Sequence, residues 1–103
     1  MPNFVVERYR SNSDPDSLRA VAARLNAGAR QVSPDGTSVR YVDTIFLPDD
    51  ETCLHLFEAA SAADVRAVTR RARIEVDRIV PAEQVEGREV GWMHHGPEKE
   101  EAS

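Results

Sequence analysis

Apolar residues recur along the chain with two periodicities, one typical of strands and one of helices, and these predict six secondary-structure elements. The first is a strand over Asn3–Tyr9. Phe4, Val5 and Val6 are apolar in succession, which is typical of a strand that is covered on both faces near its start. A loop then leads to a segment with a different period.

The second segment has apolar residues at intervals of three and four, which predicts an amphipathic helix. Asp14 is expected to cap the first turn, and Pro15 suits the first helical position, where no amide hydrogen is needed. Residues 33–36, Ser-Pro-Asp-Gly, end the helix. The apolar stripe consists of Leu18, Val21, Ala22, Leu25, Ala29 and Val32. The remaining face, with Arg19, Arg24 and Arg30, is predicted to face solvent.

The middle of the chain is predicted to form a hairpin, around which the other elements are arranged. Its strands are Ser38–Leu47 and Thr52–Glu58, both rich in β-branched and aromatic residues. The polar turn at 48–51, Pro-Asp-Asp-Glu, joins them, because proline presets a turn angle and aspartates cap nearby amides.

A second helix and a last strand follow the hairpin. Ser61 and Asp64 have the spacing of a capping box, with Asp in place of Glu. The buried side of this helix is marked by Val65, Val68 and Ala72. A strand is predicted within Val76–Val85, and Pro81 restricts it to the edge of a sheet because proline cannot donate to the ladder.

The element order is strand, helix, strand, strand, helix, strand, which predicts an α+β, ferredoxin-like fold over residues 1–85. Right-handed crossovers place both helices on one face of an antiparallel sheet. The other, bare face predicts a homodimer of the dimeric α/β-barrel kind. Residues 86–103 are rich in glycine and charge and are predicted to be a flexible extension.

Composition narrows the class of protein. The 103 residues carry a net charge of −5, which argues against a nucleic-acid partner, since such proteins need a basic face. No apolar run approaches the roughly 20 residues that span a membrane. The N-terminus lacks the pattern of a signal peptide, and Cys53 is alone and so cannot form an internal disulfide. We therefore expect a cytoplasmic protein.

Several segments resemble one family. They are MPNFVVER at 1–8, VRYVDT at 39–44 and LFEAAS at 56–61, with shorter matches at 65–66, 70–72 and 77–79. These segments resemble the small actinobacterial nickel-binding or nickel-responsive proteins, most of which are otherwise domains of unknown function. The resemblance covers about residues 1–85 and implies a ferredoxin-like chain that dimerises into an α/β barrel.

Three positions depart from what this resemblance implies. Family members tend to carry histidine at the positions of Asp43 and Val68, and cysteine at the position of His55. Valine cannot bind a metal, and an Asp–His pair is a harder donor set than histidine with thiolate. The resemblance therefore implies nickel-type binding that is altered or weakened in this chain.

The candidate metal ligands are Glu7, Asp43 and His55, which lie on three strands that this fold sets side by side. Two carboxylates and an imidazole suit a divalent metal such as nickel, or an acid–base pair. A plain turn after Leu47 places His55 beside Thr44, whereas one bulge in the hairpin brings Asp43 and His55 onto one face. The other interpretation is that these charged residues sit at strand ends or line a wet dimer cavity.

Other residues have both a structural and a chemical interpretation. Glu7 and Tyr41 are candidate ligand-binding residues, although strand tyrosines also pack with their hydroxyl at the rim. Cys53 is predicted to be a small buried hydrophobe. The arginines at 70, 71 and 73 complement a helix dipole or bind an anion. Residues 92–95, Trp-Met-His-His, suit a metal or an aromatic arm over a partner subunit.

Three functions follow from these observations. The first is a non-enzymatic, homodimeric ligand- or metal-binding protein, because the chain has no phosphate loop, no paired cysteines and no nucleophile beside a base. The second is a dimeric α/β-barrel enzyme, an isomerase or cofactor-free monooxygenase that uses the sheet-face cavity. The third is an interaction module with an inert cavity.

Overall fold

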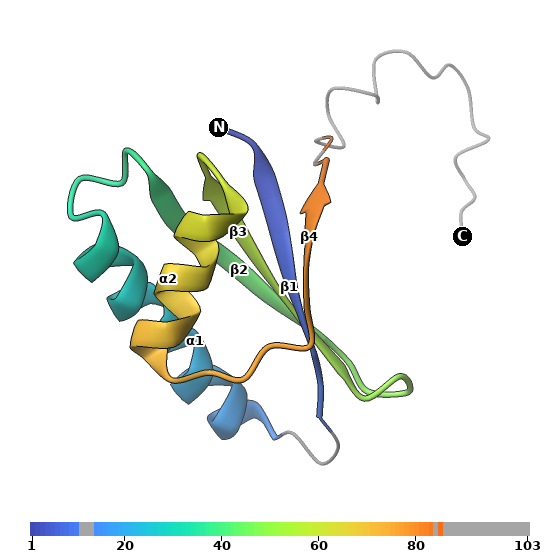
Figure 1. Cartoon of the computed structure of the whole chain (residues 1–103). Coiled ribbons are helices and arrows are strands. Elements are labelled where there is room, and N and C mark those ends of the chain that lie inside the picture. The colour runs from blue at the N-terminus through green and yellow to red at the C-terminus, as the bar shows by residue number, and fades with distance from the viewer. Residues whose placement is uncertain (11–13, 84, 86–103) are drawn as a thin grey trace, which may run out of the picture.

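The computed structural model describes residues 1–10, 14–83 and 85. A four-stranded antiparallel sheet has both helices on one of its faces (Figure 1). The elements are β1 (Asn3–Tyr9), α1 (Pro15–Val32), β2 (Val39–Leu47), β3 (Thr52–Ala59), α2 (Ala62–Ala72) and β4 (Arg78–Ala82). The strand order β2-β3-β1-β4 is that of a ferredoxin-like fold and confirms the predicted α+β class.

The helix starts follow from local side-chain chemistry. The Asp14 carboxylate accepts a 2.8 Å hydrogen bond from the Ser17 amide, with Pro15 at the first helical position of α1. The Ser61 hydroxyl accepts one of 3.3 Å from the Asp64 amide at the start of α2. Both predicted caps are confirmed. They satisfy amides that have no partner within the helix.

The core fills the space between the helices and the sheet. Its fully buried side chains are Val6, Leu25, Val39, Cys53, His55, Phe57, Val65 and Val68. The helices cross closely at Gly28, where an added Cβ would lie 3.1 Å from the carbonyl oxygen of Val68. The predicted burial of Cys53, at 1 % exposure, is confirmed.

Arg24 is exposed, as predicted, but it also makes contacts that the sequence did not indicate. Its guanidinium belongs to the exposed face of α1, but it reaches the end of α2 and donates to the carbonyls of Ala72 at 2.5 Å and Arg73 at 2.9 Å. A neighbouring helix therefore supplies partners for carbonyls that α2 leaves unpaired at its C-terminus. Arg73 ends α2 in the left-handed conformation, with φ of 58°.

The side of the sheet away from the helices bears no other element in the described part of the chain (Figure 1). We call this side of the sheet the open sheet face. Register and strand alternation put six apolar residues on it: Val5, Ile45, Leu47, Leu54, Leu56 and Val80. Ile45 is 53 % exposed and Leu47 is 38 % exposed, although both are large and apolar. This face lacks the cover that the helices give to the opposite face.

Some predictions concern residues outside the described ones. These are the flexible extension at 86–103 and the Trp-Met-His-His segment at 92–95. Of the helices that the structure describes, neither is both long and apolar enough to cross a membrane. The predicted edge position of the last strand is confirmed, because β4 pairs only with β1 among the described strands.

Candidate functional site

The register of the hairpin decides which candidate side chains meet. Asp43 pairs with Leu56, and Thr44 pairs with His55. The ladder shifts by one residue between Tyr41 and Asp43, so a bulge is present. It lies beyond Asp43 as seen from the turn, and it leaves Asp43 and His55 on opposite faces of the sheet.

The predicted metal ligands do not converge in the single chain. Glu7 and Asp43 lie on the side of the open sheet face, whereas His55 is fully buried on the helix side. The Glu7 carboxylate already accepts from the Tyr9 hydroxyl at 2.9 Å and pairs with Arg78 at 3.2 Å. Within the described residues, no three His, Cys, Asp or Glu side chains form a group suited to a metal. The β1–β3 register separates Glu7 from His55, and the absence of a bulge between the turn and Asp43 in the described hairpin separates Asp43 from His55.

The candidate ligand-binding pair is separated in the same way. Tyr41 pairs with Phe57 and so faces the helices, while Glu7 pairs with Leu54 on the open sheet face. The Tyr41 ring meets the Phe57 ring edge-on, with centroids 5.6 Å apart. Tyr41 is therefore partly a packing residue, and it does not share a pocket with Glu7.

A row of hydrogen-bonded polar side chains lies on the helix side of the sheet. The Tyr41 hydroxyl is 2.5 Å from Thr44 Oγ1, which is 2.8 Å from Nδ1 of His55. Nε2 of His55 is 3.4 Å from the Arg8 guanidinium. This row of polar side chains crosses three neighbouring strands, β2, β3 and β1. It begins at a half-buried tyrosine and ends at a buried arginine.

Burial and the charge of Arg8 determine the protonation state of the His55 imidazole. Burial lowers the pKa of His55 from 6.5 to about 4, and the nearby positive charge of Arg8 adds to this effect. His55 is therefore neutral at physiological pH. An arginine only donates hydrogen bonds, so Nε2 accepts from Arg8 and Nδ1 carries the hydrogen that is donated to Thr44.

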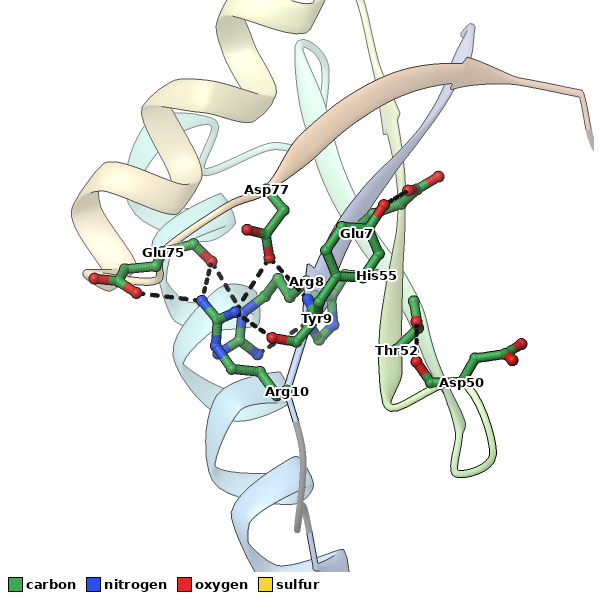
Figure 2. A network of polar contacts seen from close by, with 9 residues as sticks. All are labelled: Glu7, Arg8, Tyr9, Arg10, Asp50, Thr52, His55, Glu75 and Asp77. Carbon is green, nitrogen blue, oxygen red and sulfur yellow. Dashed lines mark hydrogen bonds and ion pairs between the residues drawn. The ribbon is translucent and has the colours of Figure 1, made fainter.

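Arg8 is itself held by the segment between α2 and β4. Its Nε donates to the Glu75 carbonyl at 3.0 Å, and Figure 2 shows the neighbouring Arg10 between Glu75 and Asp77. Arg10 pairs with these carboxylates at 3.3 and 3.1 Å, and the Tyr9 amide donates to Asp77 at 2.7 Å. Arg8 is not among the site residues predicted from the sequence, although strand alternation from Phe4 and Val6 places it on the helix side.

The row of polar side chains borders a hollow of about 230 Å³ between α1 and β2. The hollow is lined by Leu18, Arg19, Ala22, Tyr41, Asp43, Thr44 and Phe46. Its wall carries the Tyr41 and Thr44 hydroxyls, with the neutral imidazole of His55 behind them, and the charged residues Arg19 and Asp43. Such groups orient a bound molecule by hydrogen bonds, and they contain no activated nucleophile.

Comparison with known proteins places the chain in a family. The family model described as nickel responsive protein SCO4226-like matches residues 4–82. The chain belongs to the SCO4226-like family. The predicted resemblance is thereby confirmed. Among solved structures, the crystal structure of SCO4226 from Streptomyces coelicolor A3(2) is similar, with 21% identity and a TM-score of 0.68. The match covers 82% of this chain and 99% of that chain, and it supports the fold. A search of curated proteins gives no match.

The SCO4226-like family is described as nickel-responsive, so the residues of this chain must be tested against a nickel site. Of the three positions at which the resemblance implies a different metal ligand, His55 and Val68 are buried on the helix side, and Asp43 is exposed on the other. Val68 offers no donor atom, and His55 is engaged by Thr44 and Arg8. These side chains do not fit a single-chain nickel shell.

Proposed function

We propose that this SCO4226-like protein is a small, non-enzymatic ligand- or metal-binding protein that acts as a homodimer and in which nickel-type binding is altered. The observation that carries the proposal is the open sheet face, whose six apolar side chains have no cover in the described part of the chain. Family membership supports the connection to metal. A cytoplasmic location stays a prediction from the sequence.

The homodimer is supported by the position of the apolar residues. Ile45 and Leu47 lie on the edge strand β2, and Leu54 and Leu56 lie beside them on β3. A contiguous apolar patch on a soluble chain is normally buried against a partner. A two-fold assembly satisfies this requirement with a single surface, because the same patch covers itself.

Light scattering and sedimentation at micromolar concentration test the dimer. The wild type should have twice the monomer mass. Ile45→Glu should shift the protein to the monomer, because it places a carboxylate in the buried patch. Because Ile45 is 53 % exposed in the single chain, the variant should still fold. Ala23→Glu, on the exposed side of α1, is the matched control and should remain dimeric. A wild-type monomer at every concentration would refute the proposal.

Altered nickel binding is supported by the separation of the candidate donors. Glu7 and Asp43 are on one side of the sheet, and His55 is on the other beside the positive charge of Arg8. Two carboxylates without an imidazole favour harder cations than nickel. We expect nickel to bind weakly to the described part of the chain.

Calorimetric titration of the untagged protein with nickel tests this expectation. The comparison set is wild type, His55→Ala and a chain shortened to remove His94 and His95, which lie outside the described residues. Weak binding by all three proteins supports the proposal. Tight stoichiometric binding that survives both the His55→Ala substitution and the shortening would contradict it. Tight binding that is lost only on shortening would place the site in the last residues.

The enzymatic alternative required one pocket that holds Glu7, Tyr41 and a histidine. The hollow that Tyr41 shares with Thr44 does not include Glu7, because Glu7 belongs to the opposite face. The geometry therefore favours the binding function over an isomerase or a cofactor-free monooxygenase.

A further inference from the structure

The arginines of the described chain divide into two groups by their partners. Arg10, Arg19, Arg40 and Arg78 each form an ion pair with a carboxylate. Arg8 is buried in the core. Among the described residues, the others form no ion pair, and they lie on the helix layer: Arg24, Arg30, Arg66, Arg70, Arg71 and Arg73. Positive charge thus gathers on the helices of a protein whose net charge is −5.

Three of these arginines meet at one groove. It lies between α1 and α2 and has a volume of about 260 Å³. Its lining residues are Arg24, Ala27, Gly28, Gln31, Arg71, Ala72 and Arg73. Small residues such as Gly28 allow the two helices to cross closely here, and the long side chains of the three arginines also line the groove.

The helix dipole does not account for this much positive charge. The C-terminal end of α2 carries about half a negative elementary charge. Arg24 already meets it with hydrogen bonds to the Ala72 and Arg73 carbonyls. Arg71 and Arg73 then add two further charges at the same place. Like charges repel when they are brought together, so a counter-charge in the groove would stabilise the arrangement.

We propose that this groove binds a phosphate-type oxyanion. Guanidinium groups present paired N–H donors that match the oxygen atoms of phosphate, and such charge-assisted hydrogen bonds are stronger than neutral ones. Gln31 adds an uncharged donor, and its side-chain oxygen is 3.4 Å from the Arg71 guanidinium. The ligand class is therefore inorganic phosphate or a small phosphorylated molecule.

The groove is independent of the proposed dimer. The helices lie on the face of the sheet opposite to the open sheet face (Figure 1), so a dimer formed there leaves the groove accessible. The inference goes beyond the proposed function, and either one can fail without the other.

The test is a calorimetric titration of the full-length protein with pyrophosphate at low ionic strength. Arg71→Gln and Arg73→Gln should each weaken binding about tenfold, as the loss of one charge-assisted contact predicts. The matched control is Arg66→Gln, which removes an exposed arginine on α2 that does not line the groove. It should bind as the wild type does. Arg24 is left intact, because it also covers the end of α2.

Circular dichroism should first show that each variant retains its fold. An equal loss in Arg66→Gln would overturn the site, because binding would then follow general surface charge. The absence of saturable binding to the wild type would also overturn it. Citrate provides a carboxylate of comparable charge, and equally tight binding of citrate would overturn the phosphate class.

Discussion

Acid should destabilise this protein through His55 before it affects the carboxylates. The pKa of His55 is about 4 in the folded chain, because the ring is buried beside Arg8, and the ordinary value is 6.5. Above pH 6.5 the ring is neutral in both states. As the pH falls from 6.5 towards 4, the His55 imidazole takes up a proton in the unfolded chain but stays neutral in the folded chain. Stability is therefore complete above this window and is lost within it.

The size of this loss follows from the difference between the two pKa values. One proton taken up on unfolding lowers the free energy of unfolding by about 1.4 kcal/mol per pH unit. Across the window the loss approaches about 3 kcal/mol, a large fraction of the roughly 5–15 kcal/mol that holds a typical domain folded. Asp14, Asp35 and Asp77 act at lower pH, because hydrogen bonds lower the pKa of each below 3.8.

Urea unfolding at a series of pH values between about 7 and 4, at constant ionic strength, measures the effect. His55→Asn is the control, because its side-chain amide can donate to Thr44 in place of Nδ1 but does not titrate. The wild type should lose stability with the slope of one proton, and the variant should be nearly flat. The same slope in both proteins would show that the buried state of His55 is not the cause.

Substitutions at three positions test the packing and capping. Gly28→Val should destabilise by about 1–3 kcal/mol, because its side chain would press on the Val68 carbonyl of α2; an unchanged melting temperature would show that the helices can separate freely. Phe57→Ala should cost about 3–5 kcal/mol in urea unfolding, since it empties the centre of the core. Ser61→Ala should cost about 1 kcal/mol by loss of the α2 cap, and Ser61→Asp should largely restore stability.

Much of the fold could be predicted because it depends on local chemistry. Asp14 and Ser61 cap helices whose first amides need acceptors. Pro81 sits on the edge strand β4, as its missing amide requires. Each of these signals acts within a few residues, so one sequence is sufficient to detect it. The strand order then follows from the handedness of the crossovers.

The candidate site could not be predicted in the same way, because it depends on register. A shift of one residue moves a strand side chain to the other face, and nothing in the sequence of β2 marks the bulge between Tyr41 and Asp43. Arg8 shows the second reason. Its burial is tolerated because the distant Glu75 carbonyl and His55 both contact its guanidinium, and such contacts appear only in the folded chain.

The position of Arg8 also bears on whether a cation could bind at the candidate ligands of this chain. A cation that approached His55 would meet a buried positive charge at 3.4 Å, and it would have to displace the hydrogen bonds that hold the imidazole. On the other side of the sheet, a cation at Glu7 would compete with Arg78 for the same carboxylate. His55 and Glu7 are thus each already in contact with an arginine, whereas the Asp43 carboxylate accepts a hydrogen bond from the Thr44 amide. At His55 and Glu7, a bound metal would therefore have to displace arginine contacts that also hold the fold together.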